Sequence, residues 1–177
     1  MCTTTLPEAY ASLSAPDTLV LRRHLPASAE RVWSYLTDSS LRQRWLAAGA
    51  MVLQPGSPFE LVWHNDDLST SSSERPAGFP AESRATCTLT EVVPLRLLRF
   101  TWPDVGDVSF ALAPVADGVL LTVTHRRLAD RNLALMVGAG WHMHLDILVA
   151  QVAGSTPGSF WAGWTRLRAD YDQRLPA

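Results

Sequence analysis

The sequence contains no lysine, so all fifteen of its cationic side chains are arginines. Schiff-base catalysis and the P-loop type of phosphate site both need a lysine amine. The absence of lysine therefore excludes both mechanisms. With seventeen acidic residues the net charge is −2, and this balance gives no support to nucleic-acid binding, which usually shows as a basic patch.

Cysteine is also scarce, because Cys2 and Cys87 are the only two in the chain. Two cysteines cannot form a disulfide framework or a four-cysteine metal site. Cys87 lies inside an apparent strand, and we expect it to be a small buried hydrophobic residue rather than a nucleophile.

Targeting signals are missing from the sequence as well. The first seventeen residues have neither the basic nor the apolar region of a signal peptide, and no run of 18 or more apolar residues follows them. These observations predict a cytoplasmic protein that does not contact a membrane.

The chain has 177 residues, of which 47% are hydrophobic, and this size and composition suit one domain with a sizeable core. Residues 1–16 are predicted to be an irregular N-terminal leader. The remaining residues, 17–177, are predicted to form the single domain.

The first part of this domain reads as a strand followed by two short helices. The strand covers residues 18–25 and ends at Pro26. Ser28 is a suitable N-cap for the first helix, and Asp38 can cap a second helix that stops at Gly49. A strand over 58–64 follows these helices.

A polar insert with much Ser, Pro and Asp comes next, at residues 65–83, and predicts a long mobile loop in which Asp66 and Asp67 serve solubility. After it, apolar and polar residues alternate in four segments typical of strands. An Asp117-Gly118 turn signal joins the last two, which predicts an antiparallel meander with an apolar face that needs a cover. The four segments are residues 84–93, 94–102, 107–115 and 119–128.

Two segments with helical periodicity supply this cover. The first runs from about residue 130 to 153, and the second from Phe160 to the end of the sequence. Within it, His142, His144 and Asp146 stand at alternate positions, but a helix separates alternate residues by about 200°. We therefore predict no metal site here, and expect His142 and Asp146 to be a surface pair one turn apart. The apolar stripe of this helix consists of Trp141, Leu145, Leu148 and Val152.

Taken together, these segments resemble the activator of heat-shock-protein-90 ATPase-like branch of the SRPBCC, or START-like (Bet v 1-like), superfamily, over roughly residues 17–174. The segments that carry the resemblance are "ASAERVWSYLTDSSLRQRWL", "PLRLLRFTW" with a following V-x-F-x-L-x-P strand, "LLTVTHRRL", and "GWHMHLDILVAQVAG" leading to a "FW" helix. The resemblance implies an α+β helix-grip fold, in which a curved antiparallel sheet wraps around a long C-terminal helix. Many relatives bind an apolar small molecule between the two.

The resemblance brings no catalytic motif, no metal and no cofactor. The sequence also departs from the frequent R-W-W at the end of the second helix, where it has Arg44, Trp45 and Leu46. Any role tied to a second tryptophan at that place is therefore in doubt.

If the fold holds, the inward strand faces and the helix stripe would line a cavity. His144, Gln151 and His125 would orient the few polar atoms of an apolar or aromatic ligand. Seven tryptophans fit either such an aromatic pocket or a densely packed core without a ligand. The predicted ligand-binding residues are Trp63, Phe100, Trp102, Phe110, Val123, His125, Trp141, His144, Leu145, Leu148 and Gln151.

Two other functional classes stay open at this point. The family name suggests a chaperone-associated interaction protein. The oligomeric state is a separate question: sheet edges or the last helix could support a homodimer, and nothing in the sequence decides it. An enzyme of the cyclase or hydrolase kind would use His144 or His125 as general base, since histidine titrates near pH 6.5. No nucleophile or carboxylate partner for either histidine can be placed from the sequence, so a binding protein is the primary prediction.

Overall fold

The computed structural model of the chain describes residues 8–176, in which seven antiparallel strands form one sheet with the order β1-β2-β7-β6-β5-β4-β3. The consecutive strands β4 to β7 are neighbours, which confirms the predicted meander, and β7 pairs back onto β2. The strands are β1 (Ser12–Ala15), β2 (Thr18–Leu25), β3 (Pro58–Trp63), β4 (Ser83–Val93), β5 (Leu97–Trp102), β6 (Gly106–Val115) and β7 (Gly118–Arg126).

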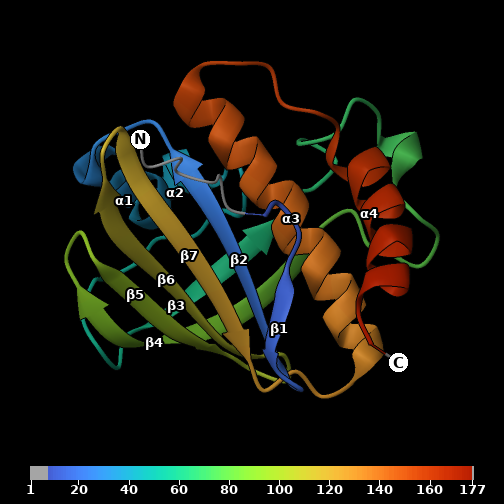
Figure 1. The fold of residues 1–177 in the computed structure, drawn as a ribbon, viewed down its shortest axis with the longest axis horizontal. Helices are drawn as coiled ribbons and strands as arrows, with labels where there is room; N and C mark the ends of the chain where they lie inside the picture. Colours follow the sequence, from blue (N-terminus) through green and yellow to red (C-terminus); the bar gives the residue numbers. More distant parts are fainter. Residues whose placement is uncertain (1–7, 177) are drawn as a thin grey trace, which may run out of the picture.

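Two short helices follow β2, and two longer helices end the chain. Figure 1 shows the sheet curving around α3, with α4 packed on the side of α3 away from the sheet and the two short helices at one end. This is the predicted α+β helix-grip arrangement. The helices are α1 (Ala29–Thr37), α2 (Ser39–Arg42), α3 (Arg131–Ala153) and α4 (Phe160–Arg174), with a 3-10 turn, η1 (Ser72–Glu74), in the loop before β4.

The two predicted N-caps are confirmed, but the second helix is shorter than predicted. Asp38 Oδ1 accepts from the N–H groups of Ser40 and Leu41, and Ser28 Oγ accepts from Arg31 N. The regular helix ends at Arg42 and the chain continues in turns to Leu46, while the buried Arg42 guanidinium binds backbone carbonyls that lie before and after it in the sequence. The acceptors are the carbonyls of Leu36, Thr37, Ala47 and Gly49.

The predicted leader contains a strand that sequence reading missed. Residues 12–15 form β1, an edge strand of four residues paired with β2. This strand is too short for the alternation of apolar residues to show, because only Leu13 in it is strongly apolar. The rest of the leader before residue 8, including Cys2, lies outside the described residues.

Helix α3 is the centre of the domain and is buried nearly all round. The sheet covers one side and α4 the other, where the Met143 side chain occupies the space left by the missing Cβ of Gly163. The predicted stripe of Trp141, Leu145, Leu148 and Val152 is buried as expected.

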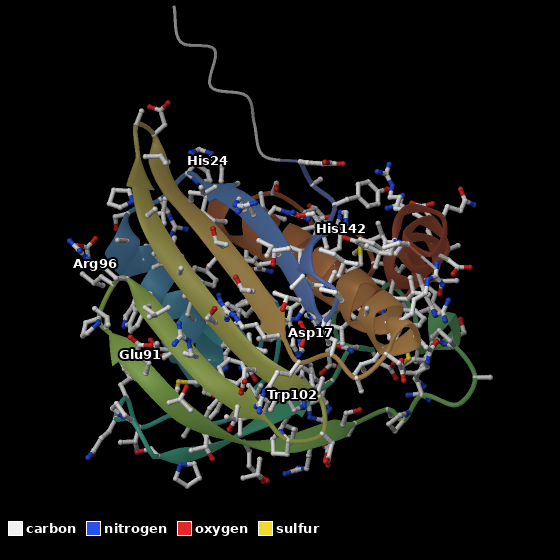
Figure 2. All side chains as sticks on the ribbon, turned by 60° about the horizontal axis from the view of Figure 1, so that its bottom comes forward. Asp17, His24, Glu91, Arg96, Trp102 and His142 are labelled. Carbon is white, nitrogen blue, oxygen red and sulfur yellow. The ribbon has the colours of Figure 1, made fainter. Side chains whose placement is uncertain are left out.

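His142 is also buried, which corrects the prediction of a surface pair with Asp146. Its Nε2 lies 3.4 Å from Asp146 Oδ2, so the pairing itself is confirmed. However, Tyr171 of α4 and Tyr10 of the N-terminal segment cover the histidine ring. Figure 2 shows His142 on the flank of α3 that faces this N-terminal segment, a cover that helical periodicity alone does not reveal.

Helix α3 is long and apolar enough to cross a membrane by length and composition alone. Yet 67% of its most apolar 18-residue window is buried inside the domain. The apolar character of α3 is thus that of the core helix of a folded domain.

Candidate binding site

A cavity of about 300 Å³ lies between the sheet, the first half of α3, α4 and the loop that precedes β4. Five of the seven tryptophans line it, together with Phe79 and Phe160. Such a volume is at the lower end of the range found for small-molecule sites. The five indoles are those of Trp63, Trp102, Trp141, Trp161 and Trp164.

The sheet side of the cavity is a stack of planar rings. Trp63 at the end of β3 and Trp102 at the end of β5 lie with their ring centroids 5.0 Å apart and 18° from parallel. Trp102 in turn stacks on His125 at 5.8 Å. Figure 2 shows Trp102 and Arg96 at opposite ends of the sheet, so the aromatic stack marks one end of it.

The opposite wall is built by α4 and by Phe79 from the loop. The Phe79 ring packs against Trp161 and Trp164 with centroid separations of 5.2 and 5.0 Å. The ring of Phe160 packs edge-on against Trp161 and contacts His144 of α3. Two aromatic groups therefore enclose the cavity from opposite sides.

The loop that carries Phe79 is held in place by several bonds, contrary to the prediction of a mobile insert. Asp66 pairs with Arg75 at 2.7 Å and accepts a hydrogen bond from Trp161 Nε1 at 2.8 Å. Leu68 O and Ser69 Oγ accept from the N–H groups of Phe160 and Trp161, and so cap the start of α4 from outside the helix. Polar residues of the insert, among them Asp66 and Ser69, thus form specific contacts with α4. The amino-acid composition of the insert could not indicate these contacts.

We expect that replacing Asp66 with alanine loosens this loop. The change removes the ion pair with Arg75 and the acceptor of Trp161, so amide hydrogen exchange should accelerate in residues 65–82 and in the first turn of α4. Asp67→Ala is the matched control, because the Asp67 side chain is exposed and no described residue pairs with it. Equal exchange in both variants would show that Asp66 does not hold the loop.

His125 does not line the cavity, although it was predicted as a polar contact for a ligand. Its Nδ1 accepts from Trp141 Nε1 at 3.0 Å, and its Nε2 donates to Val105 O at 3.2 Å. Burial lowers the pKa of His125 to about 4. Both ring nitrogens of this neutral histidine are occupied, so it positions Trp141 and Trp102 and has no free atom for acid–base work.

His144 does line the cavity, as predicted. Its Nδ1 donates to the backbone carbonyl of Trp45 at 2.7 Å, and burial lowers the pKa of this histidine to about 4. The ring is therefore neutral at pH 7. No described residue forms a hydrogen bond with its Nε2, and this atom is not fully enclosed.

The remaining predicted residues divide between the filled core and a second hollow. Trp63, Trp102 and Trp141 join His144 at the cavity, whereas five others are at most 1% exposed and pack against one another deeper between sheet and helix. These five are Phe100, Phe110, Val123, Leu145 and Leu148.

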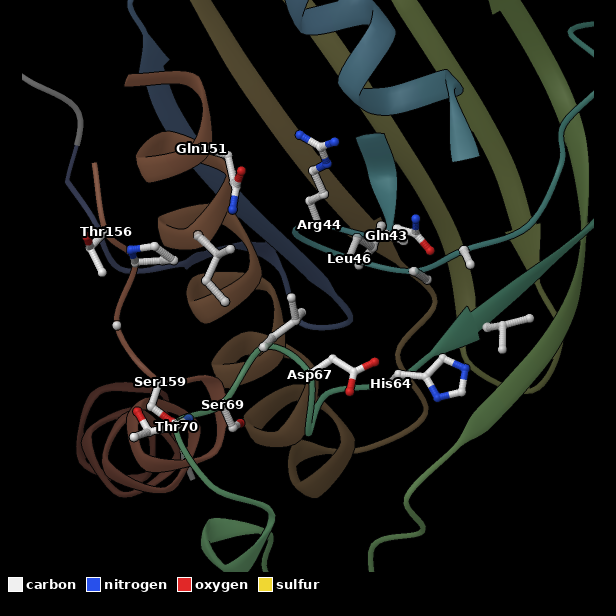
Figure 3. Close-up of a pocket in the computed structure, with 17 residues that line it drawn as sticks. Gln43, Arg44, Leu46, His64, Asp67, Ser69, Thr70, Gln151, Thr156 and Ser159 are labelled. Atoms are coloured by element: carbon white, nitrogen blue, oxygen red, sulfur yellow. Dashed lines mark hydrogen bonds between the residues drawn. The ribbon is translucent and has the colours of Figure 1, made fainter. Parts of the chain in front are cut away.

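Gln151 lies two turns beyond His144 along α3 and lines a separate groove of about 540 Å³, whose wall contains polar and apolar residues alike. Figure 3 shows Gln151 on one side of this groove, Arg44 and Gln43 on another, and Asp67, Ser69 and Thr70 opposite. Leu46, at the position where the sequence lacks a second tryptophan, lines both the groove and the aromatic cavity and so separates them.

Sequence reasoning missed the residues that close the cavity. Phe79 and the α4 residues Phe160, Trp161 and Trp164 belong to segments that had been read as loop or as cover. The clustering of aromatic residues in "FWAGW" was the available signal. Within residues 8–176 no group of three His, Cys, Asp or Glu side chains is arranged to hold a metal ion, and burial raises the pKa of Cys87 to about 12, as suits a core thiol.

A sheet gripping a buried helix, with an aromatic cavity at one end of the contact, defines a helix-grip domain of the START-like class. The sequence pattern of one family within this class, described as Activator of Hsp90 ATPase homolog 1-like protein, matches residues 26–153. The chain belongs to this family. No curated protein matches the chain.

Solved structures with the same fold come from several bacteria. A Bordetella parapertussis protein with a solution NMR structure is 34% identical, with a TM-score of 0.79 over 99% of this chain and 95% of that one. CalU16 from Micromonospora echinospora is 22% identical, with a TM-score of 0.64 over 88% and 86% of the two chains. An AHSA1-like protein from Aeromonas hydrophila is 20% identical, with a TM-score of 0.60 over 77% and 94%. The last two likenesses concern the fold alone.

Proposed function

We propose that the protein binds a small aromatic molecule in the cavity between the sheet, α3 and α4. The observation that carries this proposal is the gathering of five of the seven tryptophans around one cavity of about 300 Å³. The hollow opens to solvent, so a ligand can reach these rings while the domain stays folded. Aromatic walls on two sides favour a planar ligand, which stacks or packs edge-on at low cost.

The surroundings of the cavity support binding rather than catalysis. The lining is largely apolar, and His144 is the only histidine among the lining residues. Because burial lowers the pKa of His144 to about 4, its neutral ring is a weak base at pH 7. The chaperone-associated role stays a prediction, since no feature of the described residues favours a docking partner. The cytoplasmic location stays a prediction as well.

The proposal is tested by titrating the protein with naphthalene, a neutral planar probe, while tryptophan fluorescence is recorded. Five indoles in contact with the probe should give a saturable change, with a dissociation constant of about 1–100 μM. The same probe should raise the melting temperature, because a ligand that binds the folded state alone stabilises it. A linear, unsaturable response without thermal stabilisation would contradict the proposal.

A further inference from the structure

One side chain, that of Leu46, stands between the aromatic cavity and the neighbouring groove. Among residues 8–176 it is the only one that lines both, since every other lining residue belongs to one of the two hollows alone. Leu46 is 3% exposed, so its side chain fills the space between the hollows and is not a surface group. Figure 3 shows Leu46 in the part of the groove wall that carries Arg44 and Gln43.

The backbone on both sides of Leu46 is fixed by hydrogen bonds. Trp45 O accepts from His144 Nδ1 of α3 at 2.7 Å. Ala48 and Val62 of β3 exchange two backbone hydrogen bonds of 2.9 and 3.0 Å. Leu46 is thus held between the core helix and the sheet, and a tightly packed side chain has little room to turn aside. The partition is a fixed wall, and it sorts ligands by their shape.

The two hollows differ in size and in chemistry. The cavity holds about 300 Å³ and is walled by aromatic rings, whereas the groove holds about 540 Å³ and carries the side chains of Gln43, Arg44 and Gln151. Small-molecule sites commonly have volumes of about 300–1,000 Å³. The cavity alone lies at the lower end of this range, and a hollow that included the groove would lie well inside it.

We infer that Leu46 is the specificity-determining residue of the cavity, because it closes the way into the groove and so limits the ligand to a compact aromatic molecule. The inference rests on the proposed function and deepens it, since it gives the size class of the ligand and names the residue that sets it. Removing most of the Leu46 side chain should join the hollows, because the backbone bonds beside it remain and keep the wall from collapsing.

The test compares naphthalene with 4-(2-naphthyl)butan-1-ol, which carries an arm of four carbons that ends in a hydroxyl group. In the wild-type protein the arm has to extend through the mouth of the cavity into solvent, so the two probes should bind with affinities within about threefold of each other. In Leu46→Ala the arm can enter the groove and bury its methylene groups. There the alcohol should bind about tenfold more tightly than naphthalene.

A second variant and a second measurement accompany the titration. Leu46→Val removes less of the side chain and should give a smaller preference in the same direction, so it carries the test if Leu46→Ala fails to fold. The side-chain amide signals of Gln43 and Gln151 in a ¹H–¹⁵N NMR spectrum report where the arm lies. The alcohol should shift at least one of them in Leu46→Ala and neither of them in the wild type.

Ile147→Ala is the matched control for a change of buried volume. Ile147 is 1% exposed and lines the groove but not the cavity, so this variant enlarges the groove and leaves the partition in place. The two probes should bind to it with affinities within about threefold of each other, as they do to the wild type.

Three results would overturn the inference and leave the proposed function intact, since naphthalene would still bind. These are equal affinities for the two probes in the folded Leu46 variants, the same preference for the alcohol in Ile147→Ala, and a shift of either glutamine signal in the wild type. If naphthalene does not bind to the wild-type protein, the proposed function fails together with the inference.

Discussion

Mild acid should destabilise the protein steeply, with the free energy of unfolding falling by about 3 kcal/mol or more for each pH unit between pH 6 and pH 5. Burial lowers the pKa of His125 and of His144 from 6.5 to about 4. Burial also lowers the pKa of His142, against the opposing effect of Asp146. All three side chains are at most 6% exposed, so solvent screens these effects little.

The direction follows from proton binding. Below about pH 6.5 the unfolded chain takes up protons on these histidines, whereas the folded protein does not until about pH 4. Stability is therefore complete above pH 6.5 and is lost as the pH falls through this window, by about 1.4 kcal/mol per unit for each histidine. Urea unfolding followed by tryptophan fluorescence at pH 7, 6 and 5 measures the slope, and a stability that is flat over this range would contradict the account.

Closing the cavity from α3 should abolish ligand binding without unfolding the protein. Gly140 lines the cavity in the middle of the helix, and the nearest heavy atom to a Cβ added there is Trp164 Nε1 at 4.0 Å. We expect Gly140→Leu to extend into the cavity and to weaken naphthalene binding by about 100-fold or more, a loss of about 2.7 kcal/mol. Fluorescence titration measures the affinity, and far-UV circular dichroism confirms the fold.

The matched control is Gly140→Ala, whose single methyl fits the space available. Alanine is favoured over glycine in a helix interior, so this variant should be more stable by about 0.5–1 kcal/mol and should retain binding within about threefold. If Gly140→Leu bound naphthalene as well as Gly140→Ala does, the ligand would have to lie elsewhere.

Local patterns in the sequence were enough to predict the order of the four helices and of six of the seven strands. Alternation in residues 119–125 identified β7 and its inward face, and Ser28 and Asp38 marked the helix starts by capping chemistry. The edge strand β1 was missed because four residues hold too little periodicity. The burial of His142 was missed because a distant segment covers it.

The site was predicted only in part, because alternation tells which face of a strand is buried but not how deep each position lies. Phe100 and Trp102 share a face of β5, yet Phe100 is 1% exposed in the filled core while Trp102 lines the cavity. The difference arises from the curvature of the sheet and from the closing wall of Phe79 and α4. Neither has a signature within a single strand.

The central claim, that an aromatic ligand lies among the cavity tryptophans, is tested most directly by the seven indole N–H signals in a ¹H–¹⁵N NMR spectrum. Titration with naphthalene should shift the signals of the five lining indoles, while Trp33, which lines neither hollow, stays in place. Saturable shifts confined to those five would confirm the site. Shifts at Trp33, or none at the five lining indoles, would contradict it.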